Sequence, residues 1–297
     1  MRTLLILVTF LFVFSSFSAQ RTLYVDSFNA ILGNQEKENE LLTFVKNNEF
    51  KAIILYELHI IAKRIDMSNP KTNTILAKFI NLAKKQYEVQ EVIASAENKS
   101  FFINHISAYN KSRLKSSEKF DGLNLEYEFW QNSASNYGGY YCENYLRKNE
   151  IPCTREGSFK NFIATLSIMK LLSKESDHPI KIEAYVGNYN KTEVDEISKY
   201  VDRILVSAYE KNTEESFKSI KKALTILSQT TFKPNVSVIF SSEVEFMSGY
   251  FKYNSLEKSE LEFLSLSKNY NFKLGKFIYY KYFELKNSVK YYNFTSK

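Results

Sequence analysis

The chain is poor in the residues that define several classes of protein. Its 297 residues include only 8 Gly, 4 Pro and 2 Cys. These numbers exclude a collagen-like repeat, a proline-rich linker protein and a small disulfide-dense scaffold, in that order. The sequence also contains no G-x-G-x-x-G phosphate loop, Walker loop or EF-hand loop. The composition is otherwise that of a globular domain.

Charge of one sign does not dominate. The 40 Lys and Arg residues outnumber the 33 Asp and Glu residues by only seven, and the basic residues are dispersed. A surface of this kind does not favour nucleic-acid binding. The 21 Tyr and 24 Phe residues exclude a disordered chain, which would be poor in aromatic side chains.

Long apolar runs are missing after the first 19 residues. There, Arg2 precedes an apolar run over 4–14 and a stretch of small residues. This order is typical of a secretory signal peptide, and the run is short for a membrane span. We expect cleavage near residue 19, a domain over 20–297 and a secreted or periplasmic protein without stable membrane insertion. An uncleaved N-terminal anchor is the alternative.

The cysteine and histidine positions bear on metal binding. In an oxidising compartment, Cys142 and Cys153 are expected to form a local disulfide. Neither has a second Cys or a His at ligand spacing, so metal binding is the weaker interpretation. His59, His105 and His178 are scattered along the chain. The sequence therefore predicts no metal site, no cofactor and no Ser-His-Asp triad.

Short β-rich apolar runs alternate with longer amphipathic segments along the chain. The runs predict strands over 22–26, 51–56, 89–94, 122–129, 181–186, 203–208, 235–240 and 276–282. The longer segments predict helices over 38–46, 74–87, 101–114, 159–173, 192–200, 214–227 and 256–267, with a remnant helix or tail over 286–297. Eight such units predict a single (β/α)₈ barrel of the α/β class. An open doubly wound sheet is the alternative.

The fourth predicted strand carries the chemistry. Its alternation places Asn124, Glu126 and Glu128 on one face and Leu123 and Leu125 on the other. Barrel interiors are normally filled by bulky apolar residues, so an inward polar face points to function. Two neighbouring carboxyl groups cannot both ionise cheaply, and a raised pKa suits a general acid at a glycosidic oxygen. Alternatively, the carboxylates pair with Lys or Arg, or face solvent.

The same segment resembles the strand-four signature of glycoside hydrolase family 18, D-G-x-D-x-D-x-E. It reads Asp121-Gly122-Leu123-Asn124-Leu125-Glu126-Tyr127-Glu128. The resemblance implies that Glu128 is the proton donor and that Glu126 orients the substrate acetamide. Asn124 and Glu126 stand where the family has Asp, and the extra methylene of Glu126 displaces its carboxylate.

A second part of the resemblance lies on the sixth predicted strand. Tyr209 and Glu210 stand where the family often has Tyr and Asp, and the family's Tyr hydrogen-bonds the acetamide carbonyl. Two family features differ. Ser95-Ala96-Glu97 replaces S-x-G-G after strand three, and Tyr280 is among the tyrosines that replace the strand-eight Trp.

The resemblance implies a secreted glycoside hydrolase that acts on N-acetylglucosamine-containing glycans by substrate-assisted retaining hydrolysis. The expected sugar contacts are Asn124, Trp130, Glu210 and Tyr280. One alternative is a carbohydrate-binding pseudoenzyme whose groove aromatics include Trp130, Tyr137, Tyr140 and Tyr141; the loop over 137–141 could equally pack locally. Another is a retaining glycosidase with Glu243 of strand seven as the nucleophile. We expect a monomer whose partner is a carbohydrate.

Overall fold

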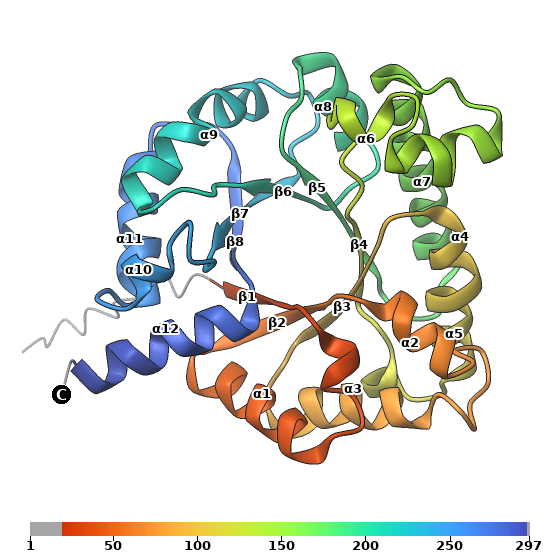
Figure 1. Cartoon of the computed structure of the whole chain (residues 1–297), viewed down its shortest axis with the longest axis horizontal. Helices are drawn as coiled ribbons and strands as arrows, with labels where there is room; N and C mark the ends of the chain where they lie inside the picture. Colours follow the sequence, from red (N-terminus) through yellow and green to blue (C-terminus); the bar gives the residue numbers. More distant parts are fainter. Residues whose placement is uncertain (1–19, 296–297) are drawn as a thin grey trace, which may run out of the picture.

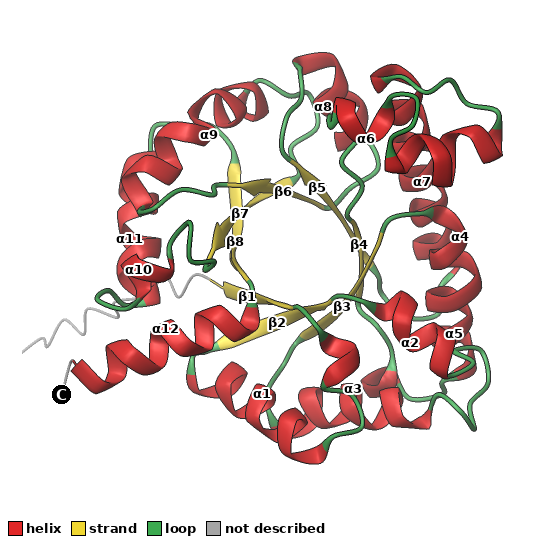
Figure 2. Ribbon diagram, in the orientation of Figure 1, coloured by secondary structure: helices red, strands yellow, loops and turns green. Residues whose placement is uncertain are grey.

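A closed barrel of eight parallel strands forms the centre of the molecule. The computed structural model describes residues 20–295, in which each strand pairs with the next and β8 pairs with β1 (Figures 1 and 2). The strands are β1 (Gln20–Val25), β2 (Phe50–Leu55), β3 (Glu91–Ala96), β4 (Gly122–Leu125), β5 (Lys181–Val186), β6 (Arg203–Ser207), β7 (Asn235–Ser241) and β8 (Lys273–Tyr280). The predicted (β/α)₈ fold is confirmed.

Helices surround the barrel on its outer side (Figure 2). They are α1 (Gln35–Asn47), α2 (Leu58–Arg64), α3 (Thr74–Gln86), α4 (Lys99–Phe101), α5 (Ala108–Ser112), α6 (Asn132–Ser135), α7 (Arg155–Glu175), α8 (Lys191–Ser198), α9 (Thr213–Ser228), α10 (Ser248–Phe251), α11 (Leu256–Ser267) and α12 (Tyr282–Thr295). Local sequence explains several helix starts. The side chain of Asn190 accepts the Glu193 backbone N–H, and Glu193 in turn accepts the Asn190 N–H.

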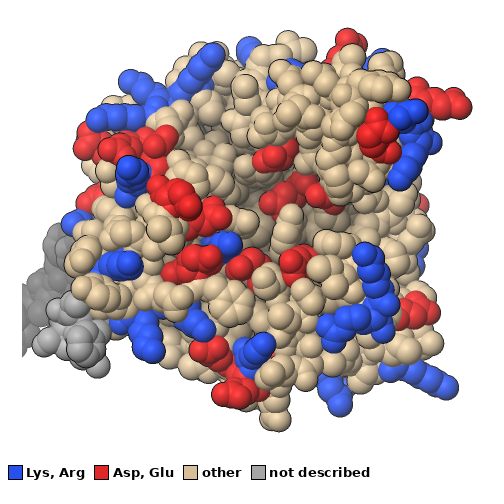
Figure 3. Space-filling model, in the orientation of Figure 1, with Lys and Arg blue, Asp and Glu red and all other residues tan. Residues whose placement is uncertain are grey.

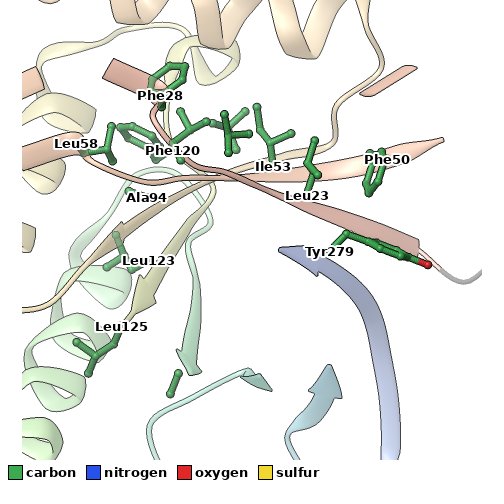
Figure 4. Packing of buried hydrophobic residues seen from close by; sticks show 14 of the residues in the cluster. Leu23, Phe28, Phe50, Ile53, Leu58, Ala94, Phe120, Leu123, Leu125 and Tyr279 are labelled. Carbon is green, nitrogen blue, oxygen red and sulfur yellow. The ribbon is translucent and has the colours of Figure 1, made fainter. Parts of the chain in front are cut away.

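Alternation along the strands divides the buried residues into two cores. The outer core lies between the barrel and the helices and includes Leu23, Ile53 and Leu123, which Figure 4 shows packed with their neighbours. The inner core fills the barrel with residues such as Ile54 and Leu205. Because side chains alternate across a strand, seven of the eight strands contribute to both cores; β4 contributes only Leu123 and Leu125, to the outer one.

The N-terminal end of the barrel interior is closed by ion pairs. Arg203 lies 2.8 Å from a carboxylate oxygen of Glu91 and 2.5 Å from one of Glu183, and Lys276 lies 2.6 Å from Glu91. All four residues come from different strands, so the pairs tie the sheet together across its interior. The burial cost of these charges is offset because each one faces an opposite charge.

Asp121, the first residue of the strand-four motif, lies just before β4 at the end opposite Glu128. Its Oδ2 accepts the Val92 backbone N–H at 2.8 Å, and its carboxylate also contacts Lys84 and His178. Asp202 repeats the arrangement before β6, where it accepts the Ile182 N–H at 2.8 Å. Both aspartates therefore join neighbouring strands.

Several predicted boundaries were wrong. Strand four ends at Leu125 instead of 129, because the chain then turns and the Glu128 carbonyl accepts the Gln131 N–H. Strand three covers Glu91–Ala96 instead of 89–94, and strand eight covers Lys273–Tyr280 instead of 276–282. The helix predicted over 101–114 contains a π-helical segment, Phe102–Ser107.

The chain ends differ from the predictions in two ways. The segment over 286–297 is no remnant, because a regular helix, α12, covers Tyr282–Thr295. The predicted signal peptide over 1–19 lies outside the described residues. Between residues 20 and 295, no helix has both the length and the apolar character needed to cross a membrane.

Candidate active site

Two carboxyl groups lie where the chain leaves β4 at the C-terminal end of the barrel. The Glu126 backbone N–H still donates to the Ala96 carbonyl of β3 at 3.0 Å. Glu128 lies in a turn, where its own backbone carbonyl accepts the Gln131 N–H at 2.9 Å. Tyr127 and Phe129, between and beyond them, are fully buried in the outer core. The alternation predicted for this segment therefore continues past the end of the strand. It directs both glutamates to the side opposite the outer core.

Glu126 has the most strongly shifted carboxyl group of the site. Burial raises its pKa to about 7, and the negative charges of Glu128 and Glu97 act in the same direction. A hydrogen bond from Ser95 Oγ to Glu126 Oε2, at 3.0 Å, opposes this shift because it stabilises the ionised form. Near neutral pH, Glu126 therefore exchanges between its protonated and ionised forms.

Glu128 is partly buried beside an inner-core tyrosine. Its carboxylate accepts a hydrogen bond from Tyr185, and its backbone N–H donates to the Tyr141 hydroxyl at 3.0 Å. Burial raises the pKa of Glu128, and the hydrogen bonds from Tyr185 and Gln131 oppose that rise. The two strand-four carboxyl groups thus both hold their protons more tightly than an exposed glutamate.

Asn124 lies beneath these carboxyl groups and is fully buried. Its Oδ1 accepts from Tyr24 at 3.1 Å and from Ser95 at 3.0 Å, while its Nδ2 donates to Glu183 at 3.4 Å. Its amide is therefore already bonded to protein groups. The Ser95 hydroxyl has one hydrogen, so Asn124 Oδ1 and Glu126 Oε2 share the same donor.

Aromatic rings surround the carboxyl groups at the C-terminal end of the barrel. The rings of Tyr209 and Tyr280 are nearly parallel, with centroids 6.1 Å apart. Trp130 packs edge-on against Tyr185, with centroids 5.4 Å apart. The negative charge of Glu126 contributes to the raised pKa values of Tyr185, Tyr209 and Tyr280, which places these hydroxyl groups in its field. Rings of this kind can stack on sugars and donate hydrogen bonds to them.

Two further predicted residues lie at the edge of this arrangement. Glu243 accepts a hydrogen bond from Ser241 at 3.0 Å and lies 3.8 Å from Lys281. Its charge also raises the pKa values of Tyr209 and Tyr280, so it shares two neighbours with Glu126. Glu210 directly follows Tyr209 and is partly exposed, and within residues 20–295 its side chain forms no hydrogen bond or ion pair.

The loop after β4 carries the predicted disulfide. Cys142 and Cys153 are bonded, with their Cα atoms 5.1 Å apart. Of the three tyrosines considered as groove aromatics, only Tyr137 and Tyr140 are exposed, at 79% and 54%. Tyr141 is buried and holds the Glu128 backbone, so it packs locally.

Several residues of the site were not identified from the sequence. Tyr24, Tyr185 and Ser95 lie on three different strands, and each touches a residue of the strand-four motif. The available signal was polar side chains at inward positions of strands one, three and five. Glu97 was noted only as a departure from the family pattern, although its charge acts on Glu126.

The described residues show no metal centre. Between residues 20 and 295, no group of three or more His, Cys, Asp or Glu side chains is arranged to hold a metal ion.

Comparisons with known proteins find solved structures with a similar fold. No protein-family model and no curated protein matches the chain. A chitinase from Ipomoea carnea is 10% identical, with a TM-score of 0.51 over 92% of this chain and 98% of that one. A chitinase from Bacteroides thetaiotaomicron is 12% identical over 91% and 95%, with a TM-score of 0.45. A dihydropteroate synthase from Anaplasma phagocytophilum is also 12% identical, over 93% and 99%, with a TM-score of 0.40.

Identities this low show a shared fold alone. The Ipomoea carnea protein aligns over nearly its whole length, so the chain resembles a chitinase in its complete barrel. The resemblance first indicated by the motifs of strands four and six is confirmed at this level. The assignment of an activity depends on the chemistry of the site.

Proposed function

We propose that the protein is a secreted glycoside hydrolase that cleaves N-acetylglucosamine-containing glycans by substrate-assisted hydrolysis with retention. The observation that carries the proposal is the position of Glu126 and Glu128, which lie beside each other at the C-terminal end of the barrel with raised pKa values. Active sites of such barrels lie at this end. The aromatic rings around the two carboxyl groups suit a sugar ligand.

Glu128 is the proposed general acid. In the first step its proton passes to the glycosidic oxygen, the bond from that oxygen to the anomeric carbon breaks, and the acetamide oxygen of the same sugar bonds to the carbon. In the second step Glu128, now ionised, takes a proton from water, and the hydroxide oxygen attacks the anomeric carbon and releases the acetamide. Two inversions at the same carbon give net retention.

Glu126 and Tyr209 are proposed to hold the acetamide. The Glu126 carboxylate would accept the amide N–H, and the Tyr209 hydroxyl would donate to the carbonyl oxygen and so position it for attack on the anomeric carbon. A hydrogen bond from the amide would stabilise ionised Glu126 and lower its pKa from about 7. Binding of the correct sugar would therefore convert Glu126 to the form that the reaction needs. Trp130 and Tyr280 are proposed sugar contacts.

The test is direct. The mature protein would be incubated with chitooligosaccharides and, separately, with a high-mannose glycoprotein, and the products analysed by mass spectrometry. Shorter N-acetylglucosamine-terminated products, absent from a Glu128→Gln control, would support the proposal. Glycan binding without any product would instead identify a carbohydrate-binding pseudoenzyme, and neither binding nor product would refute both functions.

Glu243 supplies a second candidate mechanism. Because Glu243 and Glu126 both lie near Tyr209 and Tyr280, a sugar in this space could be attacked by the Glu243 carboxylate. A covalent glycosyl-enzyme would then form. Trapping with a 2-fluoro glycoside, followed by peptide mass spectrometry, would label Glu243 in that mechanism and leave it unlabelled in substrate-assisted hydrolysis.

A further inference from the structure

A small pocket lies directly beside the candidate active site. It has a volume of about 170 Å³ and lies at the C-terminal ends of β2 and β3, under the loop that follows β4. Ser95 lines this pocket and also bonds to Glu126, so the two spaces adjoin. Sites that bury a whole drug-sized ligand are usually larger, about 300–1,000 Å³. The pocket therefore suits one unit of a chain whose next unit occupies the active site.

Glu97 is the central polar group of this pocket. Its Oε2 accepts hydrogen bonds from the hydroxyl groups of Tyr145, at 2.6 Å, and Tyr140, at 3.0 Å. Both tyrosines belong to the disulfide-bonded loop, which holds the carboxylate in place. Within the described part of the chain, Glu97 has no Lys or Arg partner, and its Oε1 forms no hydrogen bond.

The negative charge of Glu97 acts on the groups around it, and no Lys or Arg among the described residues neutralises it. With the charge of Glu126 and burial, it raises the pKa of Tyr56, which lines the same pocket. Glu57 adds a second carboxylate and accepts from Asn29 at 2.6 Å. His59, the one basic side chain of the lining, forms no ion pair with either glutamate.

The acidity of this region contrasts with the rest of the molecule. The chain has a net charge of +7, yet Figure 3 shows acidic side chains gathered in the central hollow, with most of the basic side chains farther out. A half-buried carboxylate without a cation attracts a cationic group more strongly than a neutral one. In a glycan built from N-acetylglucosamine, the group that supplies such a charge is the protonated amine of a deacetylated unit.

We propose that Glu97 is a specificity-determining residue that binds the ammonium group of a glucosamine unit next to the N-acetylglucosamine in the active site. The proposal rests on the proposed function and narrows its substrate class to partially deacetylated β-linked N-acetylglucosamine oligomers. The ammonium group would donate to the carboxylate of Glu97, whose orientation Tyr140 and Tyr145 maintain. An acetamido group at the same place would bring no charge and would have to fit a small pocket.

Binding can be measured without turnover in a Glu128→Gln background. The probes are tetra-N-acetylchitotetraose and the four tetramers that each carry one glucosamine at a defined position, studied by titration calorimetry. We expect one of the four to bind about tenfold more tightly than the fully acetylated tetramer. A further Glu97→Gln substitution, which keeps the shape and removes the charge, should abolish that preference. Glu175→Gln, an exposed charge at the end of α7 away from the pocket, should preserve it.

The outcomes separate this proposal from the proposed function. If the wild-type protein hydrolyses acetylated oligomers but no glucosamine-containing tetramer binds more tightly, the subsite proposal is overturned and the proposed function stands. A preference that survives Glu97→Gln would also overturn it. If no oligomer is hydrolysed but the preference exists and depends on Glu97, the protein binds these glycans through the pocket without cleaving them.

Discussion

The hydroxyl oxygen of Tyr141 lies 3.0 Å from the backbone nitrogen of Glu128 and accepts its hydrogen bond. Tyr141 directly precedes Cys142, which is bonded to Cys153. Glu128 lies in a turn beyond β4, where the sheet no longer bonds its N–H. The disulfide-bonded loop therefore holds the backbone of the residue proposed as general acid.

Replacing both cysteines by serine should loosen this loop more than it unfolds the barrel. The bond closes a short loop, so its loss should cost at most about 3 kcal/mol in the free energy of unfolding. Hydrogen exchange followed by mass spectrometry should show faster exchange over 126–154 and nearly unchanged exchange in the strands. Uniformly faster exchange in all strands, or two free thiols in the denatured wild-type protein, would contradict this account.

Glu128→Gln should abolish most hydrolysis and leave glycan binding nearly intact. The amide keeps the shape of the side chain but has no ionisable proton, and general acid catalysis acts in the transition state. We expect kcat on an unactivated glycan to fall by about 10²–10⁴-fold. Glu175→Gln is the matched control and should leave kcat unchanged. Wild-type specific activity in Glu128→Gln would remove the assignment of Glu128 as the acid.

Ser95→Ala should raise the pKa of Glu126 further. The serine hydroxyl donates to the ionised carboxylate at 3.0 Å and lowers its pKa, so its removal favours the protonated form. Titration of ¹³C-labelled glutamate by NMR, with the Glu126 signal identified from Glu126→Gln, would measure the shift. Ser237→Ala, a buried serine of β7 that bonds to the Lys276 backbone, provides the control. An unchanged or lower midpoint in Ser95→Ala would disagree with this role.

The ionisation of Glu126 should make folding less favourable as the pH rises. Burial raises its pKa from the ordinary 4.5 to about 7, so the folded state binds the proton more tightly than the unfolded state. The stabilisation from this proton is complete below pH 4.5 and is lost as the pH rises through about 7. Glu126→Gln should therefore become more stable relative to the wild type between pH 4 and pH 8, by up to about 3 kcal/mol.

Urea unfolding at several pH values would measure this difference. The difference between Glu126→Gln and the wild type should change mainly between pH 4.5 and 7. Glu175→Gln, which removes an exposed carboxyl group, should follow the pH dependence of the wild type. Parallel curves for Glu126→Gln and the wild type would show that the carboxyl group titrates as an exposed one.

The sequence by itself determined the fold and the identity of the two central carboxyl groups. Alternation of strand and helix patterns along the chain is a local property, and eight repeats of it predict the barrel. The two-residue period around Glu126 and Glu128 likewise assigns both to one face, and that face is the inner one in the structure. The Cys142–Cys153 bond was predicted because the expected export would place the chain's two cysteines in an oxidising compartment.

Only the tertiary structure decided what surrounds those carboxyl groups. Ser95 meets Glu126 because β3 and β4 pair in the register that sets Ser95 opposite Asn124, and no period within a single strand specifies a register between strands. The end of β4 at Leu125 depends on the turn that the chain makes after it, at Glu128. Tyr145 reaches Glu97 from a residue 48 positions away, across a loop whose path depends on packing. These contacts set the pKa values and the pocket, since burial and neighbouring charges depend on distances in space rather than along the chain.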